Sequence, residues 1–289
     1  MKTLLITGIN GYLGSNLAKR YSNEYNVIGL EYSKNNIGRI KDEFFEVFES
    51  KDGIPDEIFE KHSIDYIIHT ATFYGRDEES DSKMIYANTF LPQALIEKAI
   101  KNGCELVINT DTVLDRFTNS YALSKKQFSD WLQFYSNSNK IKVVNLELEH
   151  FYGPGTSSSN FITLMTQKML SNQEVIPLTH AEQNRDFLYI DDLLNVYDLI
   201  IEKSSEFDNY ETFNVGTGVN TKLKYILQFI KTYTSSSSKL DFGAVSYRIN
   251  ELMESQNNIS KLMNLGWKSK TSIEKGLLKI IKFEKDKNN

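Results

Sequence analysis

A tyrosine and a lysine stand four positions apart in Tyr121-Ala122-Leu123-Ser124-Lys125. On a helix this spacing puts the phenol and the ammonium on one face. A nearby ammonium lowers the pKa of a phenol, so Tyr121 can exchange a proton with a substrate oxygen that Thr110 polarises. Taken singly, Tyr121 is explained by packing, Lys125 by solvation and Thr110 by capping of a strand end. Together they predict proton transfer coupled to hydride transfer at carbon.

A glycine-rich turn, Thr7-Gly8-Ile9-Asn10-Gly11-Tyr12-Leu13-Gly14, follows a predicted buried strand and opens a predicted helix. The dinucleotide-binding fingerprint requires this context. Glycines let the backbone approach a pyrophosphate, whose charge is stabilised by free N–H groups at the helix N-terminus. Close packing of helix on strand is the alternative. We expect Gly8, Asn10, Gly11, Tyr12 and Leu13 to bind NAD(H) or NADP(H).

An acidic residue, Glu31, ends the next predicted strand. At about twenty residues past the glycines, a carboxylate can accept hydrogen bonds from the adenosine ribose, which favours NAD(H). Ser33 and Lys34 follow at once and could instead hold a 2′-phosphate, so NADP(H) stays open.

The elements that position these residues alternate between short β-branched or aromatic runs and longer amphipathic stretches. The predicted strands are Thr3–Thr7, Asn26–Glu31, Phe44–Phe48, Tyr66–Thr70, Glu105–Thr110 and Lys142–Leu148. The predicted helices lie near Gly11–Ser22, Pro55–His62, Ser82–Asn102 and Ser120–Ser136. The pattern predicts an α/β fold, a Rossmann doubly wound parallel sheet with a smaller mixed α/β C-terminal substrate lobe.

The alternation of predicted strands and helices ends after His150, where Gly153, Pro154 and Gly155 disfavour regular secondary structure. We expect residues 1–150 to form the NAD(P)-binding domain, with a later segment near 185–200 returning to it. Residues 151–289 are expected to form mainly the substrate-binding lobe.

Composition excludes several classes of function. The 289 residues, 40% hydrophobic, suffice for one large core or two smaller ones, and the net charge of -5 argues against nucleic-acid binding. The single cysteine, Cys104, cannot form an internal disulfide, so the cytoplasm is the expected location. The first apolar run, Leu4–Ile6, is too short to enter a membrane. His69 lacks a second ligand at metal-site spacing, so no metal is expected.

Further motifs accompany the glycine turn and the tyrosine–lysine pair: Tyr152-Gly153-Pro154-Gly155, Arg185-Asp186-Phe187, Ile190-Asp191-Asp192 and Asn214-Val215-Gly216-Thr217-Gly218. Over almost the whole chain this set resembles the extended short-chain dehydrogenase/reductase family of NAD-dependent epimerases and dehydratases. Within that family, four stretches resemble the CDP-abequose synthases: Asn109–Asp111, Leu148–Gly155, Phe242–Ala244 and Asn264–Lys268. Those proteins reduce the 4-keto group of a CDP-linked 3,6-dideoxyhexose. Thr110–Asp115 also resembles dTDP-4-dehydrorhamnose reductases.

The resemblance implies roles at matching positions. Tyr121 would be the proton donor, Lys125 its modulator and a ribose ligand, and Thr110 the second hydroxyl on the sugar C4 oxygen. The resemblance also implies that Asn88 orders the catalytic region. Thr70 and Ala71 are expected beside the cofactor. Tyr74, in the turn after the fourth predicted strand, is expected at the substrate, with aromatic packing as the alternative. The segment of His150 is expected to line the nicotinamide or the sugar, with packing or hydrogen bonding as the alternative.

Arg185 and Arg248 lie in the predicted substrate lobe, where a guanidinium can form bidentate bonds to a diphosphate. A surface ion pair with Asp186 or Glu251 is the alternative for both. The resemblance further implies a homodimer through a four-helix interface that includes the Ser82–Asn102 and Ser120–Ser136 helices.

Two departures from the family pattern bear on the reaction. Similar dehydratases carry threonine-aspartate-glutamate, whereas this chain has Thr110-Asp111-Thr112, which removes the base that elimination needs. Glu147 stands where many relatives have arginine. The leading hypothesis is therefore reduction of the C4 ketone of an NDP-4-dehydro-6-deoxyhexose for a surface polysaccharide precursor. The alternatives are an NAD-dependent 4-epimerase or C4 dehydrogenase with tightly bound NAD, and a non-catalytic Rossmann sensor or interaction protein.

Overall fold

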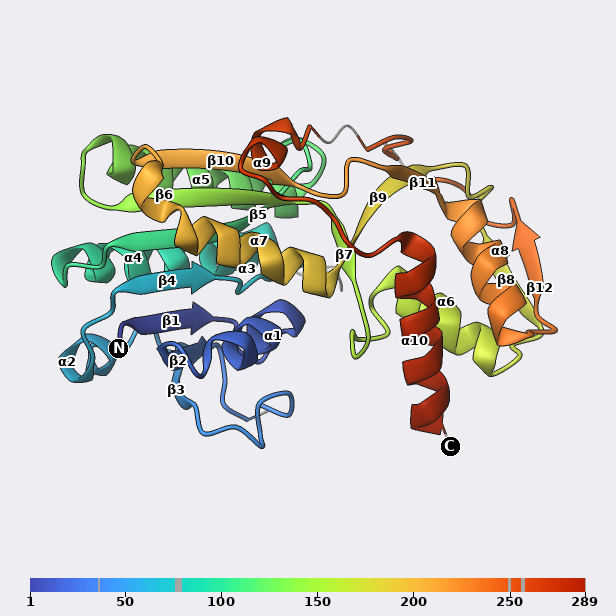
Figure 1. Ribbon diagram of the computed structural model, residues 1–289, viewed down its shortest axis with the longest axis horizontal. Helices are drawn as coiled ribbons and strands as arrows, with labels where there is room; N and C mark the ends of the chain where they lie inside the picture. Colours follow the sequence, from blue (N-terminus) through green and yellow to red (C-terminus); the bar gives the residue numbers. More distant parts are fainter. Residues whose placement is uncertain (36, 76–79, 249–250, 256–257, 289) are drawn as a thin grey trace. The chain divides into compact units, whose positions relative to one another are not determined.

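A computed structural model (Figure 1) describes residues 1–35, 37–75, 80–248, 251–255 and 258–288. Its contacts divide the chain into two units, Met1–Glu147 with Ile200–Phe213, and Leu148–Leu199 with Asn214–Asn289. The segment that returns to the first unit is thus 200–213, where the sequence suggested 185–200. The assignment of cofactor binding to one part and substrate binding to the other stays a prediction.

A seven-stranded sheet in the order β10-β6-β5-β4-β1-β2-β3 forms the centre of the first unit. Its strands are β1 (Thr3–Thr7), β2 (Asn26–Glu31), β3 (Glu46–Glu49), β4 (Tyr66–His69), β5 (Leu106–Thr112), β6 (Lys142–Leu148) and β10 (Tyr210–Val215). Strand β1 pairs in parallel with β2 and β4, β2 with β3, and β4 with β5. The strand order reverses between β1 and β4, which is where open α/β sheets bind ligands. The predicted doubly wound Rossmann fold is confirmed.

The helices that accompany this sheet are α1 (Tyr12–Tyr21), α2 (Glu57–Lys61), α3 (Asp81–Ile85), the π-helical turn η1 (Tyr86–Phe90), α4 (Leu91–Lys101) and α5 (Ser120–Asn137). In Figure 1, α1 lies in front of the sheet, and α4 and α5 lie behind it. The helix predicted near Ser82–Asn102 is confirmed in extent, but the π-helical turn η1 divides it into α3 and α4. Pro92 lacks an N–H group, and its ring crowds the carbonyl of Asn88, which widens the turn that precedes it.

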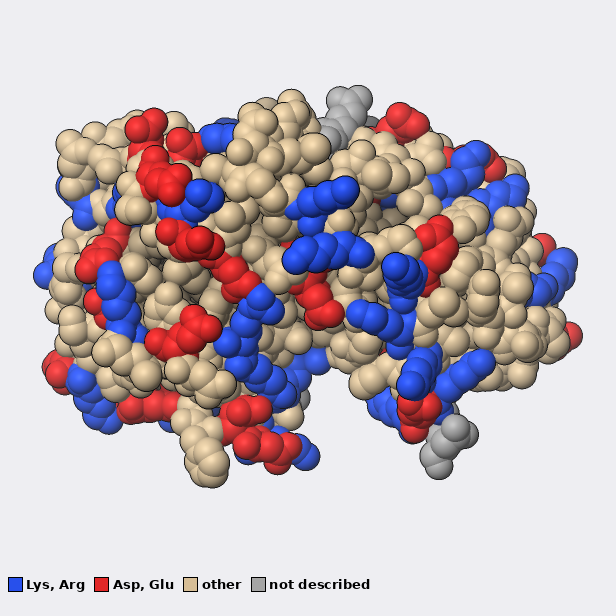
Figure 2. Space-filling view, viewed as in Figure 1, with Lys and Arg blue, Asp and Glu red and all other residues tan. Residues whose placement is uncertain are grey.

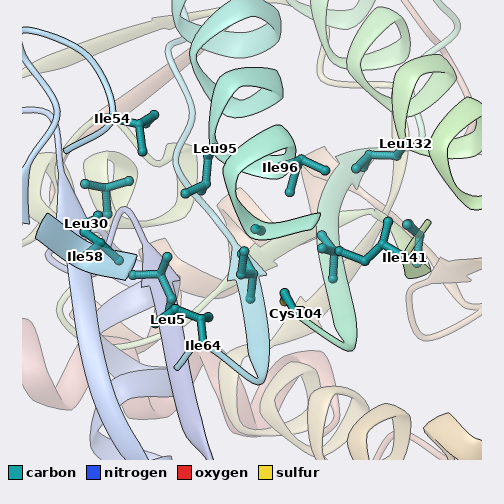
Figure 3. Packing of buried hydrophobic residues seen from close by; sticks show 14 of the residues in the cluster. Leu5, Leu30, Ile54, Ile58, Ile64, Leu95, Ile96, Cys104, Leu132 and Ile141 are labelled. Atoms are coloured by element: carbon teal, nitrogen blue, oxygen red, sulfur yellow. The ribbon is translucent and has the colours of Figure 1, made fainter. Parts of the chain in front are cut away.

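The sheet face toward α4 and α5 is apolar along most of each strand (Figure 3). Each of four strands contributes a buried apolar residue to this face, and these residues pack in one cluster with Leu95, Ile96 and Leu132 of the helices: Leu5, Ile67, Val107 and Val143. Alternate residues of a strand share a face. Two residues further along the same strands, the side chains on this face are polar: Thr7, His69, Asn109 and Asn145. The apolar core therefore gives way to a buried polar layer at the carboxyl ends of the strands.

The second unit contains two small sheets. One has the order β11-β9-β7, with β7 (His150–Tyr152), β9 (Asn184–Tyr189) and β11 (Asn220–Lys222), and the other pairs β12 (Lys239–Phe242) with β8 (Val175–Leu178). The helices of this unit are α6 (Phe161–Leu170), most of α7 (Ile190–Glu202), α8 (Leu223–Thr234), α9 (Ser260–Asn264) and α10 (Ile273–Asn288), whereas the end of α7 and the 3₁₀ turn η2 (Ser204–Glu206) belong to the first unit. Of the helices in the described ranges, none is both long and apolar enough to cross a membrane. Basic and acidic side chains are interspersed over the face shown in Figure 2.

Candidate active site

The glycine turn between β1 and α1 depends on the absence of side chains. Gly8 has a φ of +66°, and a Cβ atom there would lie 2.8 Å from the Cα atom of Ala71. At Gly14, a Cβ atom would lie 2.1 Å from the carbonyl oxygen of Gly8. Gly11 precedes the first turn of α1 and has no side chain to cap its N–H groups. The turn thus packs tightly, and no side chain caps the helix N-terminus, the end of a helix that favours an anion.

Thr7 joins the carboxyl ends of β1 and β4. Its hydroxyl forms a hydrogen bond with Nδ1 of His69 at 2.8 Å and accepts one from the N–H of Ala71 at 3.2 Å. The hydroxyl of Thr70 donates to the carbonyl oxygen of Thr7 at 2.7 Å. Burial, and then the charge of Lys125, hold the pKa of His69 well below its usual value. His69 is therefore a neutral, hydrogen-bonded residue that helps fix the Thr70–Ala71 backbone.

Glu31 lies beside the glycine turn. Its carboxylate accepts a hydrogen bond from the N–H of Asn10. The side-chain oxygen of Asn10 accepts in turn from the N–H of Arg39 at 2.8 Å. Burial raises the pKa of Glu31, and the Asn10 N–H opposes that rise. A carboxylate is thus held next to the turn, as an adenosine ribose would require.

Tyr121 and Lys125 both lie in α5. Asn119 caps this helix at its N-terminus, where its side-chain oxygen accepts a hydrogen bond from the N–H of Ala122 at 2.8 Å. Lys125 is 1% exposed, and its Nζ atom has no hydrogen-bond partner among the described residues. Burial lowers the pKa of Lys125 to about 8; Asp111 opposes this effect and Lys126 adds to it. A buried cation without a partner is unfavourable, so the geometry suits a ligand whose oxygen atoms would complete it.

The phenol of Tyr121 is enclosed by the loop after β4. Its ring stacks on Tyr74 with centroids 5.2 Å apart, and the Thr72 side chain forms a hydrogen bond with it. Burial, followed by Tyr74 and Asp111, raises the pKa of Tyr121, whereas the sequence suggested a lowered pKa. The sequence cannot show the loss of water around the ring. A phenol with a raised pKa stays protonated at neutral pH and can act as a proton donor.

The π-helical turn anchors this loop to α5. Asn88 accepts a hydrogen bond from the N–H of Phe73 and donates one to its carbonyl oxygen, both at 2.8 Å. Its amide also donates to the hydroxyl of Ser124 at 3.1 Å, and Thr89 donates to the carbonyl oxygen of Ser124 at 3.0 Å. Asn88 therefore fixes the backbone between Thr72 and Tyr74, which agrees with the ordering role that the resemblance implied.

Thr110 and Asp111 follow one another in β5, so their side chains leave opposite faces of the strand. Asp111 is 3% exposed and accepts hydrogen bonds from the N–H of Thr112 at 2.8 Å and the hydroxyl of Ser129 at 2.8 Å. The ammonium of Lys126 lies 3.2 Å from the same carboxylate. Asp111 is thus engaged within the core layer, and Thr110, which is partly exposed, is the residue of the pair that a ligand can reach.

The predicted site residues of the second unit differ from one another in exposure. His150 is exposed, 3.4 Å from the carboxylate of Glu149. Arg185 is buried and donates to Glu251 at 2.8 Å and to the carbonyl oxygen of Asn184 at 3.0 Å. Arg248 is exposed.

Asp186 is not the partner of Arg185. Its carboxylate accepts from the hydroxyl of Thr217 at 2.6 Å and from the N–H of Gly218 at 2.7 Å. The ion pair that the sequence offered as the alternative for Arg185 is therefore formed with Glu251, in a buried rather than a surface position.

The structure gathers the predicted cofactor-binding residues of the first unit around the ends of β1, β2 and β4, and brings Tyr74 against Tyr121. Sequence reasoning missed Thr72 and Lys126. A hydroxyl two residues after Thr70 was a visible signal for Thr72, but nothing in the sequence alone connects Lys126 to Asp111. Over the described ranges, no group of three or more His, Cys, Asp or Glu side chains could hold a metal ion.

The sequence and the fold of this chain are similar to those of known proteins. Residues 4–216 match the family described as "NAD dependent epimerase/dehydratase family". The chain is 33% identical to a CDP-abequose synthase of Salmonella muenchen over 98% of each chain, and 30% identical to that of Salmonella typhimurium over 96% of this chain and 97% of the other. A structure of UDP-glucuronic acid 4-epimerase from Bacillus cereus, in complex with UDP-glucuronic acid and NAD, matches over 99% of each chain with a TM-score of 0.87 and 20% identity.

Proposed function

Because the chain belongs to the NAD dependent epimerase/dehydratase family, we propose that it reduces the C4 ketone of an NDP-4-dehydro-6-deoxyhexose with hydride from NAD(P)H. Family membership makes it an NAD(P)-dependent enzyme that modifies a nucleotide sugar. The observation that carries the specific reaction is the likeness to two CDP-abequose synthases over nearly the whole chain. The product would be a precursor of a surface polysaccharide.

The residues of the first unit fit the cofactor. Gly8 and Gly14 leave no room for side chains at the turn, and Gly11 supplies no side-chain cap to α1. The buried Nζ atom of Lys125, unpartnered within the described part of the chain, suits the hydroxyls of a nicotinamide ribose. The bound cofactor would supply the hydride. Glu31 would hold the adenosine ribose, with Asn10, Tyr12, Leu13, Thr70 and Ala71 completing the cofactor site.

The phenol of Tyr121 would donate the proton to the C4 oxygen as the carbonyl is reduced. Its raised pKa keeps it protonated in the resting enzyme, and its hydrogen bond with Thr72 orients it. The charge of Lys125 would stabilise the phenolate that remains, and Thr110 would hold the C4 oxygen through its hydroxyl.

The engagement of Asp111 argues against dehydration. In the dehydratases that the sequence resembles, this aspartate helps water to leave and the next residue removes a proton. Here Asp111 is bonded to Ser129 and Lys126, and Thr112 cannot act as a carboxylate base. A 4-epimerase or C4 dehydrogenase with tightly bound NAD remains the second candidate, because Glu31 lies where it favours NAD and the B. cereus structure is that of a 4-epimerase.

In the second unit, we propose His150 as a neighbour of the cofactor and Arg185 and Arg248 as ligands of the substrate diphosphate, with Tyr74 of the first unit at the sugar. Arg185 would have to exchange Glu251 for phosphate oxygens, whereas Arg248 is exposed. Location in the cytoplasm stays a prediction.

The test is a panel of CDP-, dTDP- and GDP-linked 4-keto-6-deoxysugars, including a 3,6-dideoxy form, offered with NADH and NADPH in parallel. Oxidation of the cofactor with a gain of two mass units in the sugar supports the proposal. If no ketosugar is reduced, while NAD co-purifies and a saturated nucleotide sugar is interconverted with its C4 epimer, the second candidate takes its place.

We further propose that the protein is a homodimer. The described surface of α3, η1 and α5 exposes Ile85, Tyr86, Phe90, Trp131 and Phe134, which are between 40% and 58% exposed. Tyr86 stacks on Phe90, and η1 packs against α5. Exposed, mainly aromatic side chains on packed elements suit a second copy of the chain, because a two-fold axis pairs identical surfaces.

A further inference from the structure

Six polar side chains join β5, β6 and α5 beneath the proposed catalytic residues. Two come from each element, and we refer to them as the Lys126 cluster: Asn109, Asp111, Asn145, Glu147, Lys126 and Ser129. Strand β5 also carries Thr110, and α5 carries Tyr121 and Lys125. The cluster therefore connects the two elements that bear the three residues proposed to act on the C4 oxygen.

Lys126 is the centre of the cluster. Its ammonium donates to the carbonyl oxygen of Thr112 at 2.7 Å, to Glu147 at 2.5 Å and to Asp111 at 3.2 Å. These three acceptors match the three N–H groups of the ammonium. The side chain of Lys126 is 14% exposed and that of Asp111 is 0% exposed, so the pair is shielded from water.

The other members orient the carboxylate of Asp111. The hydroxyl of Ser129 donates to it at 2.8 Å and the amide of Asn145 at 3.2 Å. Asn109 donates to the side-chain oxygen of Asn145 at 2.7 Å. Asp111 cannot turn toward another partner without breaking several of these bonds.

Packing alone does not require this chemistry. Val107 and Val143 occupy the same face of the same strands closer to the amino end, and both are fully buried in the apolar core. Apolar residues of similar volume commonly replace buried ion pairs without loss of stability. The charges of Asp111 and Lys126, two members of the polar cluster, act on the ammonium of Lys125, which connects the cluster with that side chain.

On these observations, we propose that Lys126 is a positioning residue, which fixes α5 on β5 and β6 and, with Asp111 and Glu147, sets the charge that surrounds Lys125. The proposal rests on the proposed function, because it assigns Lys125 and Tyr121 their roles. It also accounts for Glu147, which stands where many relatives have arginine and here is the carboxylate partner of Lys126.

The charged and titratable groups that face Lys125 come from three elements. His69 faces it from β4, Asp111 from β5, and Lys126 and Tyr121 share α5 with it. Asp111 favours the charged form of Lys125 and Lys126 disfavours it. Removal of Lys126 should therefore keep Lys125 protonated to higher pH, and removal of the Glu147 charge should do the opposite by leaving Lys126 less neutralised.

The test compares Lys126→Met, Lys126→Arg and Glu147→Gln in the full chain. Lys98→Met is a matched control, because Lys98 also ties a helix to a loop, donating to the carbonyl oxygen of Ile54 at 2.7 Å and to Asp56 at 2.5 Å. With the nucleotide sugar that the unaltered enzyme reduces, Lys126→Met should lower kcat at least about 10-fold and change KM less than about twofold. Lys126→Arg should recover most of the loss.

The pH dependence separates positioning from general damage. The alkaline limb of kcat should move to higher pH in Lys126→Met and to lower pH in Glu147→Gln, and it should stay in place in Lys98→Met. Lys126→Met and Glu147→Gln with unaltered kcat and unaltered limbs would overturn the proposal.

A second readout does not need turnover. The side-chain NMR signal of Lys125 in protein labelled at lysine, assigned through its loss in Lys125→Arg, reports the titration of that residue directly. Opposite shifts of its midpoint in Lys126→Met and Glu147→Gln support the proposal even if no ketosugar is reduced, and an unmoved midpoint in both overturns it. Failure of the proposed function alone would appear as absent turnover with the shifts intact.

Discussion

At the scale of single residues, the structure holds a phenol that is hard to ionise, the proposed proton donor Tyr121, on the same helix as an ammonium that is easy to neutralise, Lys125. Burial raises the pKa of Tyr121 and lowers that of Lys125 to about 8. Both shifts have the same cause, which is removal of the side chains from water. The enclosure by Thr72, Tyr74 and the start of α5 is thus what makes this pair different from a tyrosine and a lysine on an exposed helix.

Loss of the Tyr121 hydroxyl tests the proton-donor role. Tyr121→Phe keeps the stack on Tyr74 and removes the proton, so we expect kcat to fall by about 10²-fold or more while NAD(P)H still binds. The measurement is steady-state reduction together with fluorescence titration of NAD(P)H. Tyr86→Phe, on the exposed patch, serves as the control, and a Tyr121→Phe enzyme that retains full turnover would refute the assignment.

The pKa of Lys125 gives the reaction an alkaline limit. The group is charged below its folded pKa of about 8 and neutral above it. Since the proposed role of Lys125 is to stabilise the phenolate with its charge, kcat should be at its plateau below that pH and decline as the pH rises through it. A kcat profile that stays flat to pH 10 would show that the charge of Lys125 is not required.

At the scale of elements, the glycine turn is the most sharply constrained feature. A Cβ atom at Gly14 would lie 2.1 Å from the carbonyl oxygen of Gly8, so Gly14→Ala must displace the backbone of α1 or of the turn. We expect a loss of about 1–3 kcal/mol in the free energy of unfolding and NAD(P)H affinity at least about 10-fold weaker.

Denaturant unfolding and cofactor titration measure the two effects of Gly14→Ala. The neighbouring Ser15→Ala is the control, because it removes one hydroxyl and adds no atom. Affinity that survives Gly14→Ala intact would mean that the turn serves packing only, which was the alternative for this motif.

Much of this scaffold could be predicted because each strand carries its signal within its own few residues. Strands β1, β2 and β6 have the bounds that their apolar, β-branched runs predict. Strand β3 starts at Glu46 rather than at Phe44, because its pairing with β2 begins opposite Ile28. The interruption before α4 arises from one proline against a carbonyl in the preceding turn, an effect that hydrophobic periodicity does not record.

The site could be predicted where its parts are contiguous. The glycine turn and the Tyr121–Lys125 pair each form one short segment, and the order of elements gives them meaning. The Lys126 cluster could not be found in this way, because its six residues come from three segments, each unremarkable alone. The pKa of Tyr121 was predicted in the wrong direction, since spacing shows its lysine neighbour but neither the burial of the ring nor its stacking on Tyr74.

At the scale of the whole molecule, the exposed aromatic residues of α3, η1 and α5 bear on assembly. Phe90 is 58% exposed within this patch. Phe90→Glu should convert the proposed dimer to a monomer, because a charge buried in an apolar interface is unfavourable. Sedimentation velocity at several concentrations measures the change.

Phe44→Glu provides the matched control for assembly. Phe44 is fully exposed, and it lies in the segment before β3, outside the patch. If the unaltered chain sediments as a monomer at all concentrations, the proposed dimer is wrong, whereas a Phe90→Glu protein that remains dimeric would move the interface elsewhere.

The central claim is that hydride is delivered to C4 of a nucleotide-linked 4-ketosugar. The most direct measurement is to offer the ketosugar accepted in the panel with NAD(P)H that carries deuterium at the transferable position, and to locate the label by mass spectrometry and NMR. We expect one deuterium on C4 of the product and one equivalent of cofactor oxidised per sugar. Label that stays on the cofactor, with the sugar changed only in configuration or not at all, would contradict it.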